Sequence, residues 1–260
     1  MIKDIVNWIC DYTKEHNIKT LVIGVSGGID SAVTSALCAL TGLRVIVINM
    51  PIHQDKMLDF LSDKHIDWLE MSFNNIESKK LDLTNAFDVF SDVFFESDKD
   101  SLSLANSRAR LRMMTLYQVA ATNGGIVVGT GNKVEDFGVG FFTKYGDGGV
   151  DISPIADLMK TEVYELAKEL EIVDEILDAP PTDGLWNDGR TDEDQLGASY
   201  PEIEKAMTWA EENELDQFEP TGDENFDLVL NTYFTHRLKN LHKMNSIPVF
   251  KRDEKECFAQ

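Results

Sequence analysis

The sequence predicts an α/β protein with a doubly wound, mostly parallel sheet and helices on both faces of that sheet. Three short runs, at residues 21–25, 44–50 and 126–129, are apolar at every or nearly every position. Strands of this kind belong to parallel sheets that are buried on both sides. Segments with helical spacing of apolar residues separate the runs, and the resulting β-α-β-α order favours this class of fold.

The elements of the first half follow in order along the chain. Residues 2–16 have helical periodicity, and residues 53–65 and 67–72 are predicted to form a helix and a short strand. Residues 74–100 are polar and acidic, and they suggest no chemistry. The spacing of three phenylalanines in this segment nevertheless predicts a helix with one buried face: Phe87, Phe90 and Phe94.

Length, charge and cysteine content limit the possible functions. We expect the 260 residues to form a single domain, 1–260. The net charge of −22, from 46 acidic and 24 basic side chains, argues against a nucleic-acid partner, because the chain would repel phosphates. Three scattered cysteines suit neither a disulfide framework nor a zinc site. Without a signal-peptide pattern or a membrane-spanning apolar run, we expect a cytoplasmic protein with no membrane partner.

The segment 24–31, Gly-Val-Ser-Gly-Gly-Ile-Asp-Ser, predicts a phosphate-binding loop. It joins the first buried strand to a helix, and a helix start presents free N–H groups and a positive dipole end to an anion. The loop has neither the lysine of a Walker A motif nor the glycine spacing of a dinucleotide motif. Asp30 suits such a loop if Mg²⁺ lies between it and the phosphates. The alternative is an ordinary turn in which Asp30 or Ser31 caps the helix.

A second part of the site is expected after the strand at residues 126–129. Gly129-Thr130-Gly131-Asn132 follows this strand, and Glu135 and Asp136 come next. Open parallel sheets bind ligands beyond the carboxyl ends of their strands, so Thr130 and segment 24–31 are predicted to share one edge. A carboxylate of this segment is then available to meet a metal opposite Asp30.

The helix predicted at residues 104–122 carries three arginines in an otherwise acidic chain. At about 100° per residue, Arg108 and Arg112 share one face and Arg110 points elsewhere. The simpler alternative is that all three are solvated and pair with nearby carboxylates. The expected apolar stripe of this helix consists of Leu104, Leu111, Met114, Tyr117 and Ala121.

The second half of the chain contains a glycine-rich loop, helices and a turn-rich segment. Residues 138–151 predict a shaped binding loop, because glycines alternate there with aromatic and polar side chains, and the alternative is a flexible connector. Lys160 is predicted to begin a helix to Leu170 that Thr161 or Asp157 caps. A lysine at a helix start opposes the dipole, which suggests an anion nearby, and the alternative is a plain exposed lysine. The remaining predictions are a short strand at 152–155, a mobile lid at 179–195, helices at 200–214 and 224–240, and a basic tail at 242–248.

Taken together, the motifs resemble those of the ammonia-dependent NAD⁺ synthetases, a family of N-type ATP pyrophosphatases. The Ser-Gly-Gly-x-Asp-Ser loop is shared with related families, whereas Phe-Phe-Thr-Lys-Tyr-Gly-Asp-Gly-Gly, at 141–149, is far more specific. The resemblance covers nearly the whole chain and implies an adenine nucleotide alpha-hydrolase-like fold. It implies ATP-dependent adenylation of the nicotinate carboxylate of deamido-NAD⁺, followed by displacement of AMP by ammonia. A glutaminase domain is not expected.

The resemblance also implies a role for individual residues. Those expected to bind ATP are Gly24, Val25, Ser26, Gly27, Gly28, Ile29, Asp30, Ser31, Thr130, Lys160 and Thr182. Those expected to bind deamido-NAD⁺ are Arg110, Lys144, Asp151, His242 and Lys243. Asp30 and Glu135 are expected to hold Mg²⁺, and Asp30, Lys160 and Asp151 are the candidate catalytic residues. The family further implies a homodimer with the dinucleotide at the subunit interface.

Several alternatives stay open at the level of the sequence. Counting forward from Thr130 places the second metal carboxylate at Glu135, whereas counting back from Gly140 places it at Asp136, so this segment is one residue longer than usual. Either Asp147 or Asp151 could accept a proton from the attacking ammonia. The rival functions are amidation of nicotinate mononucleotide, another N-type pyrophosphatase such as a tRNA-modifying enzyme, and a catalytically silent nucleotide-binding subunit.

Overall fold

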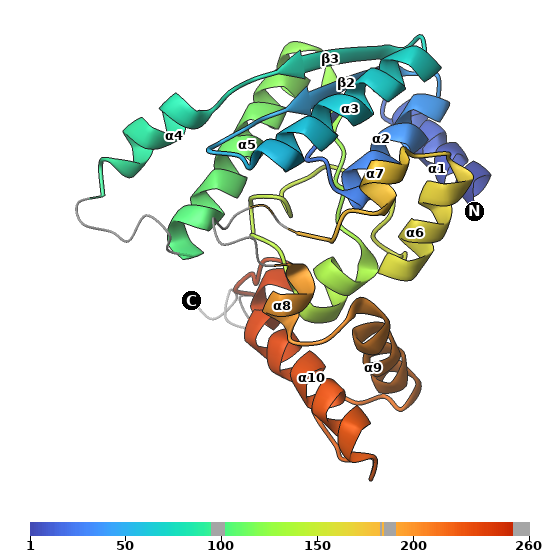
Figure 1. The fold of residues 1–260 in the computed structure, drawn as a ribbon, viewed down its shortest axis with the longest axis vertical. Helices are drawn as coiled ribbons and strands as arrows, with labels where there is room; N and C mark the ends of the chain where they lie inside the picture. The colour runs from blue at the N-terminus through green and yellow to red at the C-terminus, as the bar shows by residue number, and fades with distance from the viewer. Residues whose placement is uncertain (95–101, 183, 185–190, 252–260) are drawn as a thin grey trace, which may run out of the picture.

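A parallel four-stranded sheet organises the fold, as the sequence predicts. The computed structural model describes residues 1–94, 102–182, 184 and 191–251. Its strands lie in the order β3-β2-β1-β4 (Figure 1). They are β1 (Thr20–Gly24), β2 (Arg44–Asn49), β3 (Ile76–Lys80) and β4 (Gly125–Val127). β1 pairs with both β2 and β4. The sheet therefore extends from β1 to one side through β2 and β3 and to the other side through β4.

Helices cover both faces of the sheet because side chains alternate along each strand. Leu21 and Ile23 of β1 belong to the core on one face, whereas Val22 belongs to the core on the other. The first face is covered by α1 (Ile2–Glu15), α2 (Ile29–Leu40), α3 (Lys56–Ser72), α6 (Lys160–Glu169) and α7 (Asp174–Leu177). The second face is covered by α5 (Leu102–Thr122).

A second, smaller core lies beside these layers. It joins the π-helix Val134–Val139 to α8 (Asp192–Leu196), α9 (Tyr200–Glu212) and α10 (Glu224–Met244). In Figure 1, α9 and α10 lie below the sheet and its helices. The contacts between α9, α10 and the π-helix therefore place the second core next to the chain that follows β4.

Side chains of α10 stabilise the wide turn of the π-helix. Arg237 donates from Nη1 to the carbonyl oxygens of Phe137 and Gly138, and Asn240 donates from Nδ2 to the carbonyl oxygen of Val139 at 2.9 Å. A helix end otherwise leaves such carbonyls without partners. The segment between Thr130 and Gly140, where the two counts of the metal carboxylate differ by one, contains this π-helix, a form that accommodates one additional residue in a helix.

The predicted strand at 67–72 is wrong. Those residues continue α3, in which Leu69 is buried against the first core, and the strand that follows is β3. β3 lies at an edge of the sheet and carries charged side chains, with the Glu77 carboxylate bound to Arg44 at 2.5 Å and to Lys79 at 2.6 Å. Edge strands commonly carry charge, and the apolar pattern of a buried strand is therefore missing here.

The helix predicted within residues 74–100 is short. α4 spans Thr84–Ser91 and buries Phe87, whereas Phe90 and Phe94 are 45% and 51% exposed and their rings contact each other. The prediction of one buried face therefore holds for Phe87 alone, and residues 95–101 lie outside the described chain. The apolar stripe of α5 is also partly wrong, because Met114 is 59% exposed and Ala120 is buried in place of Ala121.

Other predictions of the second half are confirmed or corrected as follows. α6 begins at Lys160 as predicted, but neither Thr161 nor Asp157 caps it, since Glu162 accepts a hydrogen bond from the backbone N–H of Met159 instead. The strand at 152–155 is reduced to a bridge between Val128 and Ile152.

The other corrections concern the end of the chain and the turn-rich segment. His242 and Lys243 lie in the last turn of α10, not in a tail. Of the lid predicted at 179–195, residues 183 and 185–190 are outside the described part. None of the helices within the described residues is both long enough and apolar enough to cross a bilayer.

Candidate active site

The phosphate loop predicted at residues 24–31 is present at the carboxyl end of β1 and the start of α2. The Ser31 hydroxyl donates to the carbonyl oxygen of Gly28 at 2.9 Å, and it accepts from the backbone N–H of Ser26 at 3.2 Å. Gly27 has a φ of +86°, and a Cβ there would lie 2.6 Å from the carbonyl oxygen of Leu58. Only glycine fits this turn, and α2 begins two residues later, with first N–H groups that have no partner within the helix.

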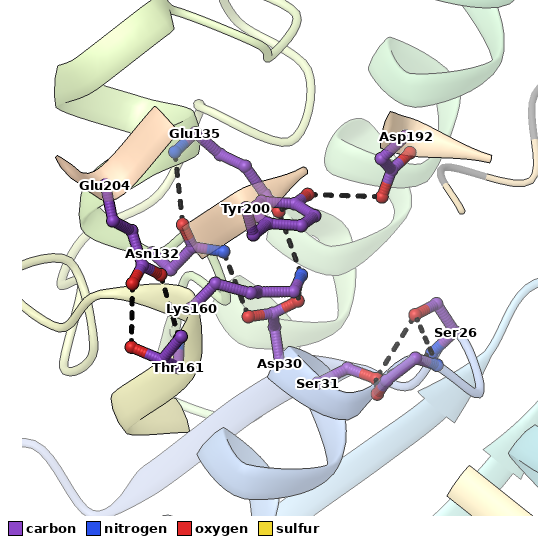
Figure 2. Close-up of polar contacts among 11 residues, drawn as sticks. Ser26, Asp30, Ser31, Asn132, Glu135, Lys160, Thr161, Asp192, Tyr200 and Glu204 are labelled. Carbon is purple, nitrogen blue, oxygen red and sulfur yellow. Dashed lines mark hydrogen bonds and ion pairs between the residues drawn. The ribbon is translucent and has the colours of Figure 1, made fainter. Parts of the chain in front are cut away.

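Lys160 joins the two carboxylates that were predicted to face each other. Its Nζ lies 2.6 Å from Asp30 Oδ2 and 2.9 Å from Glu135 Oε1, and the lysine is almost fully buried. Asn132 donates from Nδ2 to Asp30 Oδ1 at 3.1 Å, and its Oδ1 accepts the backbone N–H of Glu135 (Figure 2). Three elements, α2, the π-helix and α6, thus meet at one buried ion-pair network.

Burial and neighbouring charges shift the pKa values of this network in different directions, and burial raises the pKa of Asp30 although Lys160 opposes that effect. Burial disfavours the ammonium form of Lys160, but the adjacent carboxylates of Asp30 and Glu135 outweigh that effect and raise its pKa. Burial also disfavours ionised Glu135, but Lys160 and the hydroxyl of Tyr200 outweigh it and lower the pKa of Glu135. Both groups are therefore charged at neutral pH.

A cavity of about 750 Å³ opens over this network and receives side chains from the predicted motifs. It is lined by Gly24, Val25, Ser26, Gly27, Gly28, Ile29, Asp30, Ser31, Thr130, Glu135, Asp136, Asp147, Lys160, Thr182 and Lys243, among others. All eleven residues expected to bind ATP are in this set, so segments far apart in the sequence share one cavity at the edge of the sheet. Its volume is in the range of small-molecule sites.

Two further carboxyl groups, Asp136 and Asp147, line the same cavity. Burial, followed by the charges of Glu135, Asp147 and Asp30, raises the pKa of Asp136 well above its usual value. Burial also raises the pKa of Asp147, whose Oδ1 accepts the backbone N–H of Thr143 at 3.0 Å. The cavity therefore combines ionised Glu135 with carboxyl groups that take up a proton more readily.

Four of the five residues expected to bind the dinucleotide lie together, and one of these four, Lys243, lines the cavity. Lys144 donates from Nζ to the carbonyl oxygen of His242 at 3.0 Å, and its own carbonyl accepts from Arg110 Nε at 3.3 Å. Lys243 donates from Nζ to the carbonyl oxygen of Phe142 at 2.7 Å. Asp151 lies apart from this group and, like Arg110, Lys144 and His242, is outside the cavity lining. Its carboxylate accepts from the backbone N–H of Val127 at 2.8 Å and from the hydroxyl of Tyr117 at 3.1 Å.

The three arginines of α5 follow the predicted geometry. Arg108 is buried with its guanidinium 5.1 Å from the centre of the Phe87 ring, and Arg112 donates to the carbonyl oxygen of Met50 at 3.0 Å. Arg110 is exposed. The prediction that Arg108 and Arg112 share a face is confirmed, and the alternative of three solvated arginines is wrong.

Comparison with known proteins identifies the family. A model of the NAD synthase family matches residues 1–247. The chain is 38% identical over 251 residues to the NH₃-dependent NAD⁺ synthetase of Methanosarcina acetivorans, covering 94% of this chain and 95% of that protein. The chain belongs to the NAD synthase family. Another NAD synthase, the NH₃-dependent NAD⁺ synthetase of Mycoplasma genitalium, is 39% identical over 79% of this chain and 82% of its own length.

Solved structures of related synthetases have the same fold as this NAD synthase. The NMN synthetase of Francisella tularensis superposes with a TM-score of 0.79 at 32% identity, covering 96% of this chain and 97% of that one. The NH₃-dependent NAD synthetase of Campylobacter jejuni, solved with nitrate, gives a TM-score of 0.75 at 26% identity and the same coverage. The predicted adenine nucleotide alpha-hydrolase-like fold is confirmed.

The structure adds to this NAD synthase site two residues to which the sequence analysis assigned no role. Asn132 stands within the motif that follows β4, but its bond to Asp30 joins this segment to α2, which lies about 100 residues earlier in the chain. Tyr200, at the start of α9, donates its hydroxyl to Glu135 Oε1 at 2.5 Å (Figure 2). In the sequence, a tyrosine on a helix with apolar periodicity is typical of a core position, so no pattern distinguishes it.

Proposed function

We propose that this protein amidates deamido-NAD⁺ with ammonia and ATP, giving NAD⁺, AMP and pyrophosphate. The supporting observation is the single cavity that joins the phosphate loop, the Lys160 network and the loop 141–149. In the first step a carboxylate oxygen of the substrate attacks the α-phosphorus of ATP, and the bond to pyrophosphate breaks. In the second step ammonia attacks the acyl carbon, and AMP leaves with the oxygen that it had gained.

The residues around α2 suit the first step. The N–H groups at the start of α2 and the ammonium of Lys160 would bind the phosphates, where negative charge grows as pyrophosphate departs. Asp30 and Glu135 are the proposed Mg²⁺ ligands. The described residues hold no cluster of three or more metal-ligating side chains, but Mg²⁺ usually takes one or two carboxylates and completes its shell with phosphate oxygens and water. When bound, Mg²⁺ would offset the charge of the leaving pyrophosphate.

The other side of the cavity suits the anionic dinucleotide. Arg110, Lys144, His242 and Lys243 are the proposed contacts of deamido-NAD⁺. Of these, Lys243 lines the cavity, and Arg110, Lys144 and Lys243 supply positive charge in an acidic protein. For the proton lost by ammonia in the second step we propose Asp147, because it lines the cavity, in preference to Asp151.

The proposed biological unit is a cytoplasmic homodimer that binds the dinucleotide at the subunit interface. Exposed apolar side chains on α4 and just beyond it are consistent with a covered surface there: Val89, Phe90, Val93 and Phe94. Free ammonia, or ammonia from a glutaminase on another chain, is the proposed nitrogen source.

The test is an end-point assay for NAD⁺ with purified protein, ATP, Mg²⁺, deamido-NAD⁺ and ammonium. We expect NAD⁺ and AMP in equal amounts, with omission of any component abolishing both. Exchange of labelled pyrophosphate into ATP that requires deamido-NAD⁺ would exclude a silent nucleotide-binding subunit. We expect a higher kcat/KM for deamido-NAD⁺ than for nicotinate mononucleotide, and the reverse ranking would make the protein an NMN-forming enzyme.

A further inference from the structure

Tyr200 contacts the proposed metal ligand Glu135 from a different part of the fold. Tyr200 belongs to α9 and the second core, and it is 3% exposed. Its hydroxyl lies 2.5 Å from Glu135 Oε1. The same oxygen accepts from Lys160 Nζ at 2.9 Å. Two donors from different elements therefore fix Glu135 Oε1, and with it the orientation of the whole carboxylate.

The tyrosine ring is itself fixed on several sides. Lys160 Nζ lies 4.8 Å from the ring centre, within the range of a cation–π contact. The backbone N–H of Tyr200 donates to Glu193 Oε1 at 2.9 Å, and Asp192 Oδ2 lies 3.4 Å from the hydroxyl. Because the ring cannot turn freely, its hydroxyl defines where Glu135 Oε1 lies.

This arrangement differs from that of a tyrosine buried only for packing. A phenylalanine would fill the same volume without placing a polar group in the core, so the hydroxyl needs a reason to be there. Its acceptor is an ionised carboxylate, and charge-assisted bonds of this kind are shorter and stronger than neutral ones. Groups that orient a ligating side chain in this manner affect metal affinity although they do not touch the metal.

We propose that Tyr200 is a positioning residue: by holding Glu135 Oε1 against Lys160, it turns Oε2 toward the Mg²⁺ that accompanies ATP. This inference rests on the proposed function, because it requires a metal–nucleotide complex in the cavity. It assigns α9, which carries none of the predicted motifs, a part in forming the ATP site.

The test compares Tyr200→Phe with Tyr233→Phe. Tyr233 is a matched control, because it is buried in the same core and lies on α10, outside the cavity lining. Calorimetry would measure the affinity for α,β-methylene-ATP, which cannot be cut between its α- and β-phosphates, with and without Mg²⁺. We expect Tyr200→Phe to reduce the Mg²⁺-dependent tightening about tenfold or more, the usual effect of losing such an orienting group. Affinity without Mg²⁺ should change less than twofold, and Tyr233→Phe should match the wild type.

A second comparison isolates the contact with Glu135. In a Glu135→Gln background, adding Tyr200→Phe should cause no further loss of Mg²⁺ response, because the oriented carboxylate is already gone. Equal Mg²⁺ responses in the wild type and Tyr200→Phe would overturn the positioning role, as would an additional loss in the double variant. Either result leaves the proposed function standing if the wild type still makes NAD⁺. Absence of NAD⁺ formation by the wild type would instead overturn the proposed function itself.

Discussion

His65 should make the stability of this protein sensitive to mild acid. It lies on α3, fully buried against α2, with Nε2 2.8 Å from the hydroxyl oxygen of Ser35. Because that hydroxyl donates to the carbonyl oxygen of Ala32, Nε2 must be the protonated ring nitrogen. Nδ1 is buried without a hydrogen-bond partner among the described residues, so a second proton there would be a buried charge with no acceptor.

The size of the effect follows from the pKa of His65. Burial lowers this pKa to about 4, against about 6.5 in an unfolded chain. Between pH 6.5 and pH 4, His65 is protonated in the unfolded state but not in the folded state. The free energy of unfolding therefore falls as the pH drops. Linkage then predicts a loss of about 2 kcal/mol in the free energy of unfolding by pH 5, rising to about 3 kcal/mol below pH 4.

Urea denaturation at pH 7.5, 6 and 5, followed by tryptophan fluorescence, would measure this loss. The informative comparison is His65→Phe, which keeps a ring beside Trp68, whose ring centre lies 5.4 Å away. Because other groups also titrate, we expect the difference between wild type and variant, not the absolute slope, to be about 2 kcal/mol at pH 5. The exposed His16 supplies a control, since His16→Gln should preserve the wild-type slope. Parallel pH profiles for the wild type and His65→Phe would refute the reasoning.

Four further predictions concern the cavity. Lys160→Met should lower kcat at least 100-fold, because the positive charge beside the leaving pyrophosphate is lost, and single-turnover kinetics would measure this loss. The same variant should be destabilised by about 3–5 kcal/mol, because Asp30 and Glu135 lose their buried partner, and urea denaturation would measure that effect. Glu135→Gln should raise the Mg²⁺ concentration needed for half-maximal activity more than Asp136→Asn does, and the opposite order would make Asp136 the second ligand. Gly131→Ala should reproduce the Mg²⁺ titration of Asp136→Asn, because its Cβ would lie 2.1 Å from Asp136 Oδ2 and displace that side chain. Asp151→Asn should retain single-turnover amidation within about threefold, because an amide oxygen can still accept from Val127, and a larger loss would return the role of proton acceptor to Asp151.

The position of the site could be predicted from the sequence because it depends on topology. Parallel strands end at a common edge, so Ser26 after β1 and Thr130 after β4 had to lie near each other once both strands were recognised. For Lys160 the sequence left two alternatives, an anion nearby that compensates the helix dipole or a plain exposed lysine. Asp30 and Glu135 provide that anion.

The errors arose where tertiary contacts outweigh local pattern. β3 is a charged edge strand, whose residues show no buried alternation, so the strand was placed at 67–72 within α3. Met114 and Ala121 were assigned to the buried stripe of α5 because helical spacing fixes a face only to within about one residue. Tyr200 could not be found at all, because its proposed role depends on a contact between α9 and the π-helix that no sequence spacing encodes.

The π-helix between β4 and the loop at 141–149 has a consequence for how this segment can change length. A π-helix can contain one residue more or one residue fewer without moving the residues on either side of it, because the change is accommodated within its wide turn. Arg237 and Asn240 of α10 donate hydrogen bonds to carbonyl oxygens at the C-terminal end of the π-helix. An insertion within the π-helix therefore need not displace the loop at 141–149. Counting residues from either side is therefore a poor guide to equivalent carboxylates, and proteins with spacings that differ by one can present the same chemistry.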